Sequence, residues 1–246
     1  PVVALALLVF LISNLTRAYR WRLLFLKERI PVIRLFLIEN MGQGLNNLLP
    51  VRIASEATQF TLLTLRDRVS RGTALATLGM TRVMDIWANS LLLAGSLLFV
   101  PGAGQFARYA AGSLLFSLLL LILVRFVSWG SRGLPILRRL PLLSTFAASV
   151  AELEKRKDRL VASLAASVAV WVILGLSGWI VARSMGINLS LAQVVLVILA
   201  TIFFATSIPS LPGAVGTFEA AMVYVMGIFD VDKNLAFPYA LVMHAL

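Results

Sequence analysis

Five ionisable side chains stand in otherwise apolar stretches of this sequence: Arg52, Glu56, Arg82, Asp85 and Glu219. A charge at the centre of a membrane helix costs about 2.5–3.5 kcal/mol on insertion scales, so such residues are functional candidates by default. The forked guanidinium of arginine suits a phosphate, whereas a carboxylate suits an ammonium group, a hydroxyl group or a proton. Together these residues predict a site for a polar ligand inside a membrane.

The spacing of these residues predicts how their charges are neutralised. Arg82 and Asp85 lie three residues apart on one helix face, and an ion pair between them is as well supported as a binding role. Glu56 and Glu219 must find a partner across the bundle, bind a cation or stay protonated, which makes them the strongest candidates. Arg52 is expected to contact a phosphate, with a pair to Glu56 as the alternative.

Uncharged polar residues lie around the same positions and would complete a headgroup site. They are Asn46, Asn47, Ser55, Ser210 and Thr217. Helix capping is the alternative role for each of them. Glu39 is expected either to line a pathway or to pair with Arg34, and the lone His244 is expected only to pack between helices.

The composition is that of a membrane protein. Of 246 residues, 60% are hydrophobic and 13% are charged, and the mean hydropathy is +0.93. A soluble domain has roughly 45–50% apolar and 25% charged residues. At roughly 20 apolar residues per spanning helix, the chain has room for about six to eight membrane elements. A large aqueous catalytic domain is therefore excluded.

The residues that the sequence lacks exclude several chemistries. It has no cysteine and one histidine, so we expect no disulfide, thiolate nucleophile or metal site. It has no nucleotide-binding loop, metalloprotease motif or Ser/His/Asp set, and we expect no cofactor. We interpret the net charge of +11 as basic loops that face anionic lipid at the cytoplasmic side, not as a nucleic-acid surface.

Hydrophobic runs and basic clusters predict an all-α polytopic membrane protein. Basic clusters at residues 17–34 and 66–71 mark the cytoplasmic side. Apolar residues at three- and four-residue spacing predict an amphipathic cytoplasmic helix at 143–160. Membrane-crossing segments are expected at 1–13, 73–100, 109–124, 160–182 and, in part, 235–246.

Two further segments are predicted to be re-entrant helical hairpins. Residues 35–65 are flanked by basic clusters at both ends and are broken at 46–52, so this hairpin would enter from the inside. Residues 184–229 carry one charge, Glu219, and are broken at 207–216, so the second hairpin would enter from the outside.

The tips of the two hairpins resemble each other. They read Leu48-Leu-Pro-Val-Arg-Ile-Ala-Ser-Glu56 and Ser210-Leu-Pro-Gly-Ala-Val-Gly-Thr-Phe-Glu219. Their opposite orientation is typical of an inverted repeat, in which broken helices build an anion site near the midplane from their N-termini. The alternative is a chance match in which proline and glycine merely kink packed helices. The predicted site comprises Asn47, Pro50, Arg52, Glu56, Arg82, Asp85, Pro212, Gly213, Gly216, Thr217 and Glu219.

We expect a single transmembrane domain over residues 1–246. Repeat one would cover about 1–100, a connecting span and the amphipathic helix about 105–158, and repeat two about 160–246. Because both ends fall inside apolar runs, we expect a fragment of a longer chain.

These motifs resemble the membrane region of lysylphosphatidylglycerol synthetases and related flippase-like proteins. The motifs are Asn47-Leu-Leu-Pro50 with Glu56, Leu65-Arg66, Arg82-x-x-Asp85 and, most specific, Ser210-Leu-Pro-Gly-Ala-Val-Gly-Thr-Phe-Glu219. The resemblance covers nearly the whole chain. It departs at Ser55, Gln59 and Thr81, where glycine, arginine and glutamate are usual, and these departures bear on headgroup specificity more than on fold.

The resemblance implies a multi-pass protein of the bacterial inner (plasma) membrane that moves a phospholipid or glycolipid between leaflets. In the synthetases, aminoacyl transfer belongs to a separate soluble domain, and nothing like it is present here, so this chain is not expected to be an enzyme. The expected partners are membrane lipids and a second copy of the chain.

Three other functions stay open besides a lipid flippase. The first is an ion-coupled transporter of a small anion, in which the glutamates carry protons. The second is a membrane-embedded lipid transferase with Asp85, Glu56 or Glu219 as general base. The third is a membrane anchor for a lipid-modifying or glycosyltransferase enzyme.

Overall fold

The protein is a bundle of helices. The computed structural model describes residues 1–48, 54–100, 103–133, 141–207 and 212–246. In these ranges it contains helices and no strand, which confirms the all-α prediction. Four helical stretches are long and apolar enough to cross a membrane, as a multi-pass membrane protein requires. They are Val2–Leu23, Arg71–Phe99, Gly104–Val127 and Lys157–Ser184.

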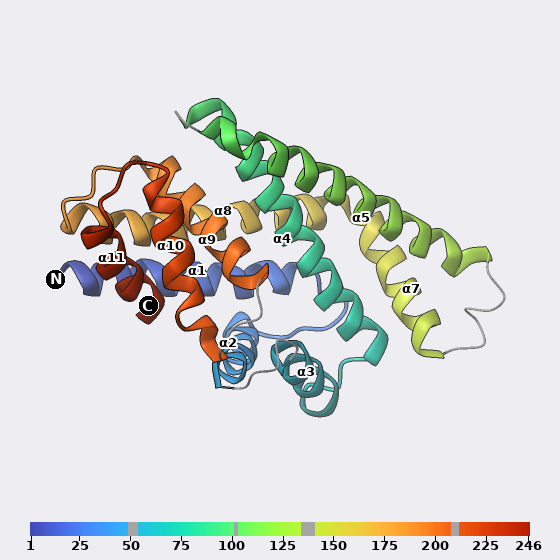
Figure 1. Cartoon of the computed structure of the whole chain (residues 1–246). Coiled ribbons are helices and arrows are strands. Elements are labelled where there is room, and N and C mark those ends of the chain that lie inside the picture. The colour runs from blue at the N-terminus through green and yellow to red at the C-terminus, as the bar shows by residue number, and fades with distance from the viewer. Residues whose placement is uncertain (49–53, 101–102, 134–140, 208–211) are drawn as a thin grey trace.

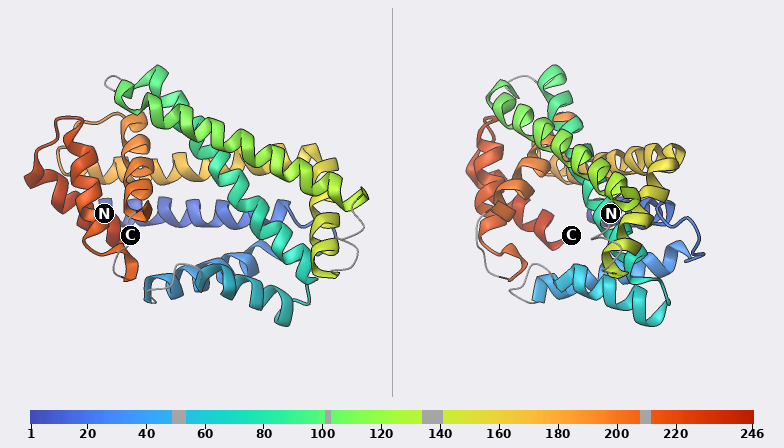
Figure 2. Two further views of the ribbon diagram at one scale, coloured as in Figure 1. Left: turned by 45° about the vertical axis from the view of Figure 1, so that its right-hand side comes forward. Right: turned by 90° about the vertical axis from the view of Figure 1, so that its right-hand side faces the viewer.

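Two long helices, α1 (Val2–Leu23) and α8 (Lys157–Ser184), lie side by side at the centre of the molecule (Figures 1 and 2). Ser13 Oγ donates a hydrogen bond to the carbonyl of Val170 at 2.9 Å, and Ser177 Oγ donates to the carbonyl of Ala6 at 2.7 Å. The residue nearer the start of α1 thus bonds the residue nearer the end of α8, so the two helices are antiparallel. Serine hydroxyls that bond across helices are a common means of joining them in membranes.

Helix α4 (Arg71–Phe99) crosses this central pair, and α5 (Ala107–Gly133) packs against α4 (Figure 1). The N-terminus of α4 is capped by Ser70 Oγ, which accepts a hydrogen bond from the amide of Thr73 at 3.1 Å. Helix α4 matches the segment predicted at 73–100 to within one residue at its end, and α5 includes the segment predicted at 109–124.

Most of the segment predicted to be an amphipathic helix, 143–160, forms α7 (Pro141–Lys155), which packs on α4 and α5, and its last residues begin α8. It buries Ala147, Val150 and Leu153, which recur at three-residue spacing. Helix α7 is followed at once by α8, as the apolar pattern predicts.

The first predicted hairpin forms α2 (Val32–Leu48) and α3 (Ala54–Thr61), and the latter continues into a π-helical turn, η1 (Leu62–Arg66). The two helices pack closely at Gly42, where an added Cβ would lie 2.7 Å from Ser55 Oγ. Asn46 Oδ1 accepts a hydrogen bond from the amide of Ser55 at 3.0 Å and so joins the end of α2 to the start of α3.

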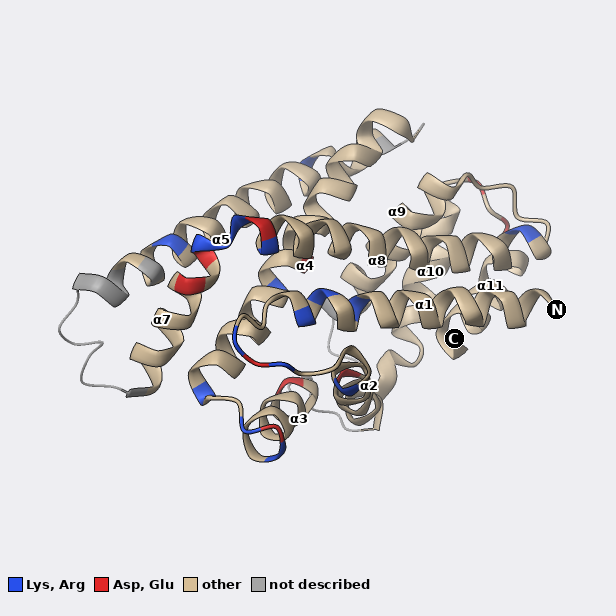
Figure 3. Ribbon diagram, turned by 180° about the vertical axis from the view of Figure 1, so that it is seen from behind, with Lys and Arg blue, Asp and Glu red and all other residues tan. Residues whose placement is uncertain are grey.

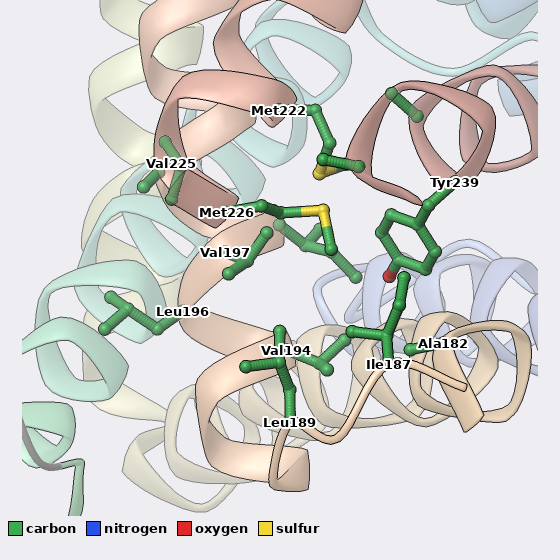
Figure 4. Packing of buried hydrophobic residues seen from close by; sticks show 14 of the residues in the cluster. Ala182, Ile187, Leu189, Val194, Leu196, Val197, Met222, Val225, Met226 and Tyr239 are labelled. Atoms are coloured by element: carbon green, nitrogen blue, oxygen red, sulfur yellow. The ribbon is translucent and has the colours of Figure 1, made fainter. Parts of the chain in front are cut away.

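The second predicted hairpin forms α9 (Leu191–Ser207), a short 3₁₀ turn η3 (Pro212–Ala214) and α10 (Thr217–Gly227), followed by α11 (Lys233–Ala245). Met222 and Met226 of α10 lie between α9 and α11 in the largest buried cluster (Figure 4). Tyr239 Oη donates a hydrogen bond to the carbonyl of Gly178 at 3.2 Å, which ties α11 to α8. The re-entrant topology and the inverted repeat remain predictions.

Most charged residues lie in one part of the molecule, at the end of α1, the start of α8, on α5 and α7, and in the hairpin of α2 and α3 (Figure 3). The α9 helix has no charged residue. One member of the basic cluster at 17–34 differs from expectation: Arg20 lies within α1, is 2% exposed and faces the bundle, not a loop. Its position makes it part of the site described next.

Candidate functional site

Glu56 and Arg82 form an ion pair between α3 and α4. Arg82 Nη2 donates a hydrogen bond to Glu56 Oε1. Of the two alternatives for Arg82 and Asp85, the ion pair between them does not form in the structure, because α3 packs against α4 and brings another acid to Arg82. The exposed fractions of the Arg82 and Glu56 side chains are 54% and 39%, so a ligand can reach both groups.

Asp85 is paired with Arg20 of α1. Arg20 Nη1 donates to Asp85 Oδ1 and lies 3.2 Å from Ser167 Oγ of α8, so the guanidinium joins three helices. A guanidinium that is 3% exposed requires such a partner, because an unpaired buried charge is strongly destabilising. Sequence reasoning missed Arg20, which the basic residues around it made look like one of several surface charges.

Glu39 of α2 lies close to these pairs. It interacts electrostatically with Arg17, Arg20, Arg82 and Asp85. It does not pair with Arg34, because Arg34 bonds Asp67 at 3.1 and 3.3 Å. Six residues thus form what we term the charge cluster: Arg17, Arg20, Glu39, Glu56, Arg82 and Asp85.

The charge cluster has a formal net charge of zero but keeps unused hydrogen-bonding capacity. Arg20 Nε, Glu39 Oε2 and Glu56 Oε2 are buried without a hydrogen-bond partner among the described residues. An unsatisfied buried donor or acceptor costs about 1–3 kcal/mol. A ligand that supplies both an acceptor and a donor would therefore be stabilised here.

The ends of the two hairpins meet. Helix α2 packs against η3, and a Cβ added at Gly213 would lie 3.6 Å from the carbonyl oxygen of Asn47. The backbone of Gly213 has φ of 68° and that of Gly216 has φ of 81°, conformations that glycine adopts without strain. The predicted Pro50 and Arg52 lie outside the described residues.

Glu219 is held from two sides. Its Oε2 accepts a hydrogen bond from the amide of Gly216 at 2.8 Å, and its Oε1 lies 2.5 Å from Nδ1 of His244. The Gly216 contact is one half of a capping box at the start of α10. Thr217 Oγ1 donates to the carbonyl of Ala214 at 2.9 Å, a bond that closes the turn before the helix.

His244 is the second residue that the sequence did not identify. It stands 25 positions after Glu219, and no local periodicity links the two. The only feature of the sequence that could have indicated a role for His244 is its position as an isolated polar residue in an apolar helix. The structure brings Glu219 and His244 together because α10 and α11 pack as an antiparallel pair joined by a short turn.

Two of the departures from the family pattern lie next to each other. Gln59 Nε2 donates a hydrogen bond to Ser55 Oγ at 2.9 Å, and both side chains are buried where α3 meets α2. The third, Thr81, donates to the carbonyl of Leu78 at 2.7 Å. None of the three contributes a charge to the site.

Fold and site together define a multi-pass helical membrane protein with buried and half-buried charge pairs beside two helical hairpins. The family model for the lysylphosphatidylglycerol synthase TM region matches residues 1–246, so the chain belongs to this family. This confirms the resemblance inferred from its motifs. No curated protein and no solved structure matches the chain.

Proposed function

We propose that this protein moves a phospholipid or glycolipid between the leaflets of the plasma membrane. The observation that carries the proposal is the charge cluster, in which three arginines and three acids lie among apolar helices and leave a donor and two acceptors unused. Such a cluster is costly in a membrane protein unless it serves a polar ligand.

The pair between Arg82 and Glu56 is the point at which a headgroup would enter. A lipid phosphate would replace the carboxylate on Arg82, since guanidinium binds phosphate in the same forked geometry. The freed Glu56 would then accept an ammonium or hydroxyl group of the same headgroup. With an ammonium headgroup the exchange leaves no charge unpaired, and with a hydroxyl group Glu56 keeps a hydrogen bond. The acyl chains stay in the surrounding lipid.

The meeting hairpins supply the means of alternating access. With opposite orientations, they would open the site to one leaflet at a time as one half of the protein rocks against the other. We orient the strongly charged part seen in Figure 3 toward the cytoplasm, because loops rich in lysine and arginine stay on that side.

Leaflet exchange of fluorescent lipids by the full chain in liposomes tests the proposal. Glu56→Gln and Arg82→Gln should each lower the exchange rate at least tenfold in protein that remains folded. Arg125→Gln is the matched control, because Arg125 forms an arginine–glutamate pair with Glu154 at 2.8 Å outside the charge cluster, and this variant should exchange lipid normally.

Comparing lipids that differ in headgroup identifies the cargo in the same assay. Unchanged exchange in both cluster variants, or no exchange by the folded parent under any imposed gradient, contradicts the proposal. Saturable uptake of a water-soluble anion in place of lipid exchange would point to a solute transporter.

A further inference from the structure

The imidazole ring of His244 is held between two oxygen atoms. Nδ1 lies 2.5 Å from Glu219 Oε1, and Nε2 lies 2.7 Å from the carbonyl oxygen of Gly213. The ring also packs against Phe218, with 4.8 Å between the ring centroids. The exposed fractions of the Glu219 and His244 side chains are 10% and 26%, so water can replace few of these contacts.

A neutral histidine beside an ionised glutamate has one proton too few for these contacts. A carbonyl oxygen only accepts hydrogen bonds, so Nε2 must carry a hydrogen. A neutral ring then has a bare nitrogen at Nδ1, which would face an ionised carboxylate oxygen without a hydrogen between them. The contact is favourable only if Nδ1 is protonated or if Glu219 is protonated and donates to Nδ1.

We propose that Glu219 and His244 form a proton-binding site, and that the proton bound there is the coupling ion of transport. This inference rests on the proposed lipid movement. With the proton bound, the ring bridges α10 to Gly213, the residue that lies beside Asn47 of the first hairpin. Without the proton, no hydrogen lies between one ring nitrogen and the oxygen atom that it faces. The ring then no longer connects Glu219 to Gly213. The proton thus controls the contact between the hairpins.

Glu219 is the one acid that His244 contacts among the described residues. The helices with the most contacts to α10 and α11 are α8 and α9, and η3 also contacts α2. The α9 helix carries no charged residue. The titratable side chains elsewhere on these elements and in the loop before α11 are Arg34, Glu39, Lys157, Asp158, Arg159, Arg183, Tyr224, Asp230, Asp232, Lys233 and Tyr239.

None of these side chains is seen to form a hydrogen bond or an ion pair with Glu219 or His244. Lys233 begins α11, about 16 Å along the helix from His244 at 1.5 Å per residue. Arg183 lies in the last turn of α8 and donates a hydrogen bond to Asn188 Oδ1 at 3.0 Å. Tyr239 donates to the carbonyl of Gly178. The ring and the carboxylate therefore share their proton only with each other.

The proposed route for the proton is an open groove of about 950 Å³ between α10 and α11. Gly216, Glu219 and Lys233 are among the residues that line it. Its other walls are mainly apolar, among them Val223, Phe237 and Leu241. The groove would let water or a lipid headgroup exchange a proton with the pair.

The single histidine of the sequence makes the site directly observable. Protein labelled with ¹⁵N-histidine, purified without a polyhistidine tag and reconstituted in bilayers, gives ring signals from His244 alone. We expect the parent to show a form of the ring that shares an added proton with Glu219, as the contacts at both ring nitrogens require. Glu219→Gln should leave a neutral ring where the parent ring holds the proton. A neutral ring at every pH, or identical titrations for parent and variant, overturns the site.

Lipid exchange under an imposed pH gradient tests the coupling. The gradient should change the parent's net rate at least fivefold, and it should have no effect on His244→Asn or Glu219→Gln. Glu152→Gln, on an exposed acid paired with Lys27, is the matched control and should respond as the parent does.

The two measurements separate the two proposals. A titrating ring in a protein that exchanges no lipid contradicts lipid movement and leaves the proton site standing. If the net rate of lipid exchange does not change with the pH gradient, the proton is not the coupling ion, and the proposal of lipid movement still stands.

Discussion

Asp85 accepts its hydrogen bond from Arg20 on α1, although Arg82 lies one turn away on its own helix. Arg82 is thereby left to pair with Glu56 of the first hairpin. One pair has a buried arginine and joins α1 to α4, whereas the other is half exposed and joins the hairpin to α4. The four charges thus divide into a pair suited to holding the fold and a pair suited to exchange with a ligand.

Removing Arg20 should destabilise the protein strongly. Arg20→Met leaves the Asp85 carboxylate without its partner, and breaking a buried pair in this way typically costs about 3–5 kcal/mol. Unfolding of purified protein in mixed micelles measures the loss. Arg20→Met combined with Asp85→Leu should recover most of it, because the buried charge is gone.

Lys27→Gln is the control for this experiment. Lys27 bonds Glu152 at 2.9 Å, but the exposed fraction of its side chain is 74%, so its loss should not change stability measurably. A loss in Arg20→Met no larger than that in Lys27→Gln would show that the buried pair does not stabilise the bundle.

Gly42→Ala should weaken the first hairpin. The added Cβ would lie 2.7 Å from Ser55 Oγ and 3.1 Å from Gln59 Nε2, so α3 must shift, at a cost of about 1–3 kcal/mol. Gly44→Ala on the same helix meets nothing within 4 Å and should be neutral or stabilising. The free energy of unfolding of Gly42→Ala should be lower than that of Gly44→Ala. Equal values contradict the close packing of α2 on α3.

Gly213→Ala should impair lipid exchange more than it impairs folding. An L-residue at φ of 68° is strained by about 1–2 kcal/mol, and the turn must relax next to Asn47, where the hairpins meet. Gly227→Ala, with no contact within 4 Å of the added Cβ, is the control. The rate of leaflet exchange and the unfolding midpoint are measured for both variants. Normal exchange by Gly213→Ala means that the tip geometry is not required.

Loss of either central serine bond should cost a small, additive amount. Ser13→Ala and Ser177→Ala each remove one hydrogen bond between α1 and α8, and such bonds average about 0.6 kcal/mol in a membrane bundle. The double variant should lose about the sum, because well-separated sites are usually additive. Unfolding of the three variants tests this, and a double loss well above the sum would mean that the two contacts form as one unit.

The sequence predicted the helices well because hydrophobic runs and their interruptions are local features. The segment at 109–124 lies on α5 and the segment at 73–100 matches α4 to within one residue, whereas the segment at 143–160 is divided between α7 and the start of α8. Charge pairing was predicted poorly because it depends on which helices pack together. Arg82 and Asp85 are neighbours on one face of α4, yet each bonds a residue of another helix.

The two residues that sequence reasoning missed illustrate the same limit. Arg20 is one of several basic residues in a row, and only its contact with Asp85 and Ser167 distinguishes it. His244 is far from Glu219 in sequence and becomes its partner when α11 folds back on α10. Side chains in both cases acquire their roles from tertiary contacts that no spacing rule encodes.

The serine bonds between α1 and α8 also restrict how the two halves of the molecule can move. Sliding one helix along the other would break both bonds, which lie about two turns apart. Rolling one helix on the other would also carry each hydroxyl away from its carbonyl. The two helices are therefore expected to move as one body, so that any opening of the hairpins takes place around this pair.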